Sequence, residues 1–108
     1  MSQLVHPEIT VGTIFCLDIG YTSRNPKFLK VVRRTNAQVV MKELRSIVVS
    51  HDGYMQNGTK IASDELVENA VEIKSRLRTN KYNNKPEIKV GYWSGYKWEG
   101  QGEAFYTD

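Results

Sequence analysis

The stretch KFLKVVRRTNAQVVMKELRSIVVS, residues 27–50, decides the fold class. Residues 27–35 are rich in β-branched and aromatic side chains, which favour extended strands. The polar triplet TNA, residues 35–37, is typical of a short turn, and residues 38–50 return to a β-branched, partly alternating pattern. We therefore expect a β-hairpin here, whose second segment fits either one long bent strand or two strands.

The segments on either side of this hairpin are also typical of strands and turns. Residues 13–19, TIFCLDI, form an apolar run bounded by glycines and suit a buried strand. Residues 20–28, GYTSRNPKF, read as a shaped connection, because Pro26 disfavours a helical residue before it. We expect Arg24 and Lys27 in this connection to face solvent. Residues 51–60 contain Asp-Gly and Asn-Gly pairs, which indicate a loop or small hairpin.

The later half of the chain predicts a second hairpin. Residues 70–78 and 87–93 alternate apolar and polar side chains, and the polar loop 79–86 separates them. This pairing brings together four cations: Lys74, Arg76, Arg78 and Lys89. Residues 63–69, SDELVEN, are the one helix candidate, since Ser63 could cap it.

These segments add up to one domain over residues 1–108. We expect an all-β fold, or a β fold with one short helix. Five to seven short strands without a long helix favour a small antiparallel barrel of the SH3-like or OB-like kind.

Basic charge is concentrated late in this chain of net charge +3. Residues 1–73 carry eight Lys or Arg against eight Asp or Glu, whereas residues 74–97 carry seven cations against Glu87 alone. Seven of the eleven aromatic residues also lie after residue 80. Cations interleaved with aromatic rings can hold phosphates while the rings stack on bases.

This pattern predicts a site for an anionic ligand, either nucleic acid or a phosphorylated nucleotide. The predicted site residues are Arg76, Arg78, Lys81, Tyr82, Lys89, Trp93 and Tyr96, with Arg24 and Lys27 as an extension. The alternative is structural, because strand cations are commonly solubilising and aromatic residues in a small barrel are commonly core.

The residues give little support to an enzyme. Cys16 stands alone in an apolar run, and His6 and His51 lack neighbours at metal-ligand spacing. A triple of Cys16, His51 and Asp52 is a combination that any chain of this length offers by chance. Phosphate-loop and dinucleotide signatures are missing. We therefore expect a protein without catalysis, cofactor or metal.

Features of a secreted or membrane protein are also missing. Apolar runs fall well short of the roughly 18 residues of a membrane span. The start of the chain has neither the basic region nor the apolar core of a signal peptide. These observations predict a cytoplasmic protein with no membrane partner.

Three segments resemble a family of small, uncharacterised proteins encoded by phages and prophages. They are VGTIF at 11–15, GYTSRNPKFLKVV at 20–32 and KVGYWSGYKWEGQ at 89–101. The similarity extends over roughly residues 11–45 and 74–106. It implies a phage-type accessory protein in the host cytoplasm and brings no catalytic residues with it.

Three hypotheses of function follow. The first is a module that binds nucleic acid or a nucleotide, in keeping with an anti-defence role. The second is an inhibitor of a host defence protein or host enzyme, with the aromatic segment GYWSGYKW as the anchor of the interface. The third is a structural or assembly protein of the virion, a homo-oligomer joined through exposed strand edges.

Overall fold

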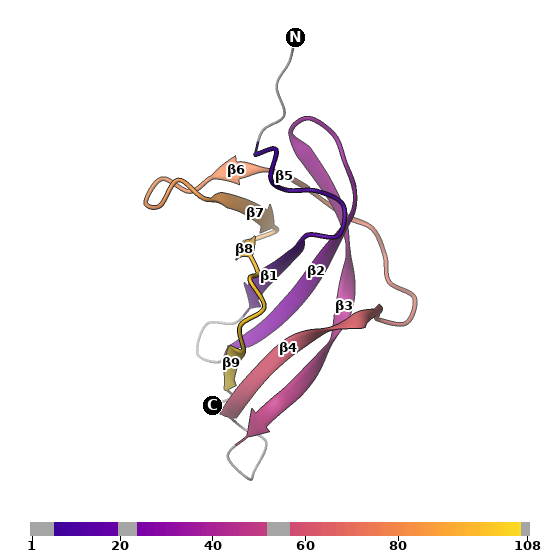
Figure 1. Ribbon diagram of the computed structural model, residues 1–108, viewed down its shortest axis with the longest axis vertical. Helices are drawn as coiled ribbons and strands as arrows, with labels where there is room; N and C mark the ends of the chain where they lie inside the picture. Colours follow the sequence, from indigo (N-terminus) through magenta and orange to yellow (C-terminus); the bar gives the residue numbers. More distant parts are fainter. Residues whose placement is uncertain (1–5, 20–23, 52–56, 107–108) are drawn as a thin grey trace.

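The computed structural model describes residues 6–19, 24–51 and 57–106, and these residues form no helix. Their strands are β1 (Ile14–Ile19), β2 (Asn25–Arg34), β3 (Gln38–His51), β4 (Asn57–Leu66), β5 (Ile73–Arg76), β6 (Arg78–Thr79), β7 (Pro86–Val90), β8 (Trp93–Lys97) and β9 (Glu103–Tyr106). The strand order is β6-β7-β8-β1-β2-β3-β4-β9, and β5 also pairs with β3. This antiparallel sheet curls into a half-barrel (Figure 1), so the all-β prediction is confirmed.

The hairpin expected at residues 27–50 is the centre of the sheet. Strands β2 and β3 pair from Phe28 opposite Leu44 to Arg34 opposite Val39, with a bulge after Val31. In the turn, the Thr35 amide donates to the Gln38 carbonyl oxygen over 2.9 Å. Strand β3 is one long strand, and register shifts interrupt its pairing with β4.

The sheet carries an apolar core on each face. Neighbouring residues of a strand point to opposite faces, so Phe15 and Cys16 belong to different cores. The larger core is built from β1, β2 and β3 with Ile9, Leu77 and Ile88. The smaller core contains Cys16, Phe28 and Leu44, and the Trp98 ring packs edge-on against Phe28 with 5.0 Å between ring centroids.

Two expectations from the sequence were wrong in detail. The helix candidate 63–69 is the end of β4 followed by a turn, because Leu66 pairs with Leu44 and continues the ladder. The expected range of five to seven strands was too low, since the described residues form nine. One cause is a break at Leu77, which divides the expected strand 70–78 into β5 and β6. The Leu77 amide donates to the Ala37 carbonyl oxygen over 2.8 Å.

The last strand, β9, lies between β4 and the beginning of β2. It pairs with β4, from Lys60 opposite Glu103 to Asn57 opposite Tyr106. On its other side it lies beside the beginning of β2 (Figure 1). The Arg24 guanidinium donates to the Ala104 carbonyl oxygen over 2.7 Å across this gap. Side chains, rather than a strand ladder, therefore join β9 to β2.

Candidate functional site

The predicted cations lie on three neighbouring strands and one loop. The predicted pairing of residues 70–78 with 87–93 was wrong for β5, and only its end forms, where Arg78 on β6 lies opposite Glu87 on β7. Strand β5 pairs with β3 but also touches β7, because the Lys89 amide donates to Ser75 Oγ over 3.0 Å. We call the exposed cations of this region the basic surface: Lys74, Arg76, Arg78, Lys81, Lys85 and Lys89.

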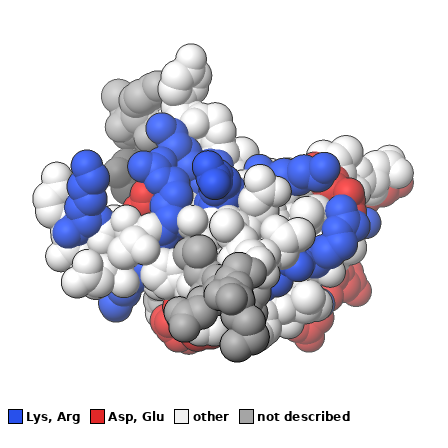
Figure 2. All heavy atoms as spheres, turned by 90° about the horizontal axis from the view of Figure 1, so that it is seen from above, with Lys and Arg blue, Asp and Glu red and all other residues white. Residues whose placement is uncertain are grey.

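The cations of the basic surface have no acidic partners among the described residues. The ion pairs with acidic side chains involve other cations: Arg24, Lys27, Arg33 and Lys97. Figure 2 shows Lys and Arg side chains spread over the end of the molecule near β5, β6 and β7. Unpaired exposed cations keep their full charge available to an anionic ligand.

The loop at residues 80–85 presents Tyr82 to solvent. The Asn80 side-chain oxygen accepts from the amides of Tyr82 (2.8 Å) and Asn83 (3.3 Å). The Lys85 amide donates to the Asn83 side-chain oxygen over 2.9 Å. This local bonding gives the loop a defined shape, and the Tyr82 side chain at its tip is 97 % exposed.

A second exposed ring, Tyr92, was not among the predicted site residues. It lies with Gly91 in the two-residue turn between β7 and β8 and is 91 % exposed. The alternation predicted a strand through 87–93, whereas Gly91 and Tyr92 form a turn there; the glycine was the sequence signal, since hairpin turns favour a positive φ, and that of Gly91 is 61°. Tyr82 and Tyr92 thus lie beyond opposite ends of β7, a five-residue strand about 16 Å long.

Trp93 is less accessible than the prediction requires of a stacking surface, whereas Tyr96 stays partly exposed. Trp93 is half-buried and packs against the larger core. Tyr96 is 38 % exposed, and its hydroxyl donates a short hydrogen bond to Glu103 Oε1. The most exposed aromatic side chains are those of the two turns, Tyr82 and Tyr92.

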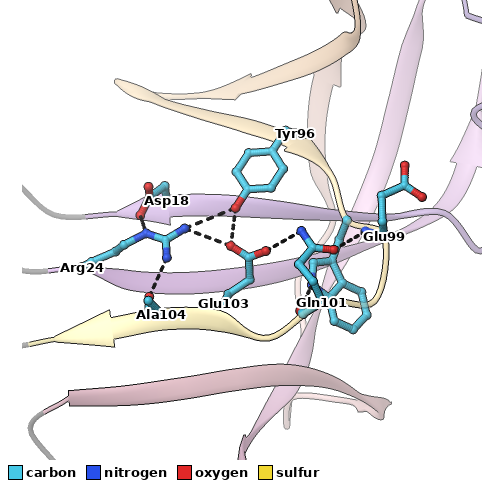
Figure 3. Close-up of polar contacts among 8 residues, drawn as sticks. Asp18, Arg24, Tyr96, Glu99, Gln101, Glu103 and Ala104 are labelled. Carbon is cyan, nitrogen blue, oxygen red and sulfur yellow. Dashed lines mark hydrogen bonds and ion pairs between the residues drawn. The ribbon is translucent and has the colours of Figure 1, made fainter.

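Arg24 does not face solvent, so this expectation was wrong. Its guanidinium donates to Asp18 Oδ1 (3.0 Å) and to Glu103 Oε1 (2.9 Å), and it also reaches the Tyr96 hydroxyl over 3.2 Å (Figure 3). Glu103 is a buried carboxylate, so its need for a cationic partner outweighs the exposure expected of a loop arginine. Lys27 is more exposed but lies 3.6 Å from Glu43 Oε2.

The same network fixes the connection between β8 and β9. Gln101 Nε2 donates to Glu103 Oε2 over 2.6 Å, while Gln101 Oε1 accepts from the Glu99 amide over 3.0 Å (Figure 3). The Trp98 indole donates to the Gln101 carbonyl oxygen over 2.8 Å. Glu103 therefore bonds to the residue before β2, to β8 and to the connection between β8 and β9.

Burial shapes the protonation of this network. Burial raises the pKa of the Tyr96 phenol above its ordinary value, and the hydrogen bond to Glu103 adds to the effect. Burial also raises the pKa of the Cys16 thiol to about 11. For Arg24, burial acts to lower the pKa, but the bonds to Glu103 and Asp18 outweigh it and raise the pKa. All three groups keep their protons at neutral pH.

Among the described residues, no three His, Cys, Asp or Glu side chains are grouped to hold a metal ion. Cys16 is fully buried, and the side chains of His51 and Asp52 lie outside the described residues. No membrane-spanning helix is found in the part of the chain that the structure describes.

No family model, curated protein or solved structure matches this chain.

Proposed function

We propose that this chain is a non-catalytic module that binds single-stranded nucleic acid on the basic surface, in keeping with the phage-type accessory proteins that its motifs resemble. The observation that carries the proposal is Tyr82, 97 % exposed at a loop tip between the exposed cations Lys81 and Lys85. A ring in this position contributes little to the stability of the fold, and its face is accessible for stacking on a base.

The charges support an anionic polymer as the ligand. Each phosphate that a Lys or Arg neutralises releases condensed counterions, which supplies most of the sequence-independent affinity for nucleic acid. Six exposed cations without acidic partners among the described residues are spread over neighbouring elements. Such a spread matches a chain of phosphates better than one phosphate group.

The two exposed rings support a single strand over a duplex. Stacking on an aromatic side chain needs an unstacked base, and each such contact is worth about 1–3 kcal/mol. Tyr82 and Tyr92 lie at opposite ends of β7, with Lys89 between them in the sequence of the strand.

The two other hypotheses have weaker support. An inhibitor anchored on GYWSGYKW would use Trp93 and Trp98, but both are half-buried and pack against the two cores. An assembly protein would use the edge of β3 beyond Leu44, where the described residues provide no second neighbour. However, a bulge lies between Val48 and Ser50 in that edge, and bulges discourage pairing of strand edges.

Fluorescence anisotropy tests the proposal with labelled single strands of DNA and RNA of about 12 nucleotides, and with a duplex of equal length. We expect tighter binding of the single strands, a clear loss of affinity for Tyr82→Ala, and near-normal affinity for Tyr82→Phe, which keeps the ring. Absence of binding at low salt, or equal affinities of Tyr82→Ala and wild type, would contradict the proposal.

A further inference from the structure

A pocket of about 430 Å³ opens beside the basic surface, between the loop 80–85 and the connection from β8 to β9. Its volume lies within the range of about 300–1,000 Å³ that is usual for small-molecule sites. Lys85 lines the pocket and also belongs to the basic surface. A strand bound on that surface therefore passes the mouth of the pocket.

The sheet itself forms one wall. Glu87 on β7 and Tyr96 on β8 are directly opposite each other in the ladder, so their side chains lie on the same face. The hydroxyl of Tyr96 is bonded to Glu103, which holds the phenol ring in place. The ring can thus offer a fixed stacking surface beside the Glu87 carboxylate.

Internal hydrogen bonds hold the polar walls in position. Asn80 Nδ2 donates to Glu87 Oε2 over 2.8 Å, and Gln101 is bonded to Glu103 and to the Glu99 amide. The other carboxylate oxygen, Glu87 Oε1, and the Asn83 side-chain amide nitrogen make no hydrogen bond to a described residue. These two groups are oriented by their neighbours and still able to bind a ligand.

The charge of the pocket differs from that of its surroundings. Glu87 is the only acidic residue between Lys74 and Lys97, and it lines the pocket together with Glu8 and Glu99. Carboxylates repel phosphates but accept hydrogen bonds from the exocyclic amino groups of cytosine, adenine and guanine. Uracil and thymine have no exocyclic amino group and present carbonyl oxygens, which carboxylates repel.

We propose that this pocket receives one base of the bound strand, stacks it on Tyr96, and prefers bases with an exocyclic amino group over thymine or uracil. The inference rests on the proposed function, since it names the part of the ligand that the same region selects. Loop residues Asn80 and Gln101 act as positioning residues in this account, and Glu87 makes the selective contact.

Competition between two DNA strands tests the inference: an all-thymine strand, and the same strand with one central cytosine. We expect the cytosine to strengthen binding by about fivefold or more, the equivalent of one good base contact. Glu87→Gln keeps the oxygen that accepts from Asn80 and should remove most of this preference without changing the salt dependence. Glu68→Gln removes the same charge from an exposed turn outside the pocket and should keep the preference.

The two proposals fail in different ways. Equal binding of the two strands by the wild type, or an unchanged preference in Glu87→Gln, overturns the pocket assignment and leaves the single-strand function standing. Failure of both strands to bind at low salt overturns the function itself and the pocket assignment with it.

Discussion

The Arg24 guanidinium donates to Glu103 Oε1 over 2.9 Å, and the two residues are 79 positions apart in the chain. Arg24 precedes β2 and Glu103 begins β9, so the pair joins the last strand to the beginning of β2. Glu103 is buried and Arg24 is largely covered. The half-barrel is therefore closed on this side by an ion pair and its hydrogen bonds.

Loss of this ion pair should destabilise the fold. Arg24→Ala leaves the buried Glu103 carboxylate without its cationic partner, and breaking such a pair typically costs about 3–5 kcal/mol. Urea denaturation gives the free energy of unfolding. The matched control is Arg33→Ala, which removes an exposed pair with Glu72 and should cost under about 1 kcal/mol. Similar losses for the two variants would show that the Arg24 pair does not close the sheet.

Gly95 should not tolerate a methyl group. A Cβ at this position would lie 2.9 Å from Ile88 Cγ1 and 3.1 Å from the Cys16 carbonyl oxygen. We expect Gly95→Ala to lower the thermal midpoint and to cost about 1–3 kcal/mol, as overpacking usually does. Gly102→Ala is the control, because its Cβ would meet Thr59 only at an ordinary contact of 3.4 Å. A neutral Gly95→Ala would contradict the close packing of β7, β8 and β1 at this point.

Stability should fall at alkaline pH because of Cys16. Its thiol has a pKa of about 11 in the folded chain, against an ordinary value of 9.0. The unfolded chain therefore releases this proton first, so the contribution is complete below pH 9 and is lost as the pH rises through 11. A shift of this size corresponds to about 3 kcal/mol.

Cys16→Ala isolates that contribution from other groups. The raised pKa of Tyr96 acts in the same direction, and the variant keeps it. Chemical denaturation from pH 8 to pH 11 should show a shallower loss of stability in Cys16→Ala than in the wild type. Parallel pH profiles of the two proteins would assign the alkaline loss to groups other than Cys16.

Local patterns predicted the parts of the fold that depend on neighbours in sequence. The hairpin at 27–50 and the polar loop at 79–86 follow from side-chain alternation and turn residues; the structure contains both, with Thr79 and Pro86 paired at the ends of the loop. The segment 63–69 has helix-capping residues, yet its pairing with Leu44 makes it a strand end. Pairing across the sheet decided this segment, and propensity could not predict that pairing.

The candidate site also has a part that local patterns predict and a part that depends on distant residues. Exposed cations at Arg76, Arg78 and Lys81 follow from strand alternation and loop polarity. The burial of Arg24 depends on its ion pair with Glu103, which is far away in the sequence, and no local pattern predicts that partner. The pocket likewise combines residues from several elements, so it forms only when the chain has folded and these elements lie side by side.

The salt dependence of single-strand binding tests the central claim most directly. If about four cations of the basic surface contact phosphates, the logarithm of the association constant should fall with the logarithm of salt concentration at a slope of about −3. The double variant Arg76→Ala/Arg78→Ala should reduce this slope by about 1.4, because each lost phosphate contact removes about 0.7. The control Arg45→Ala, which removes one cation from the part of β3 that borders β4, should keep the slope of the wild type. Binding that is absent at low salt, or a slope that the double variant leaves unchanged, would contradict the account.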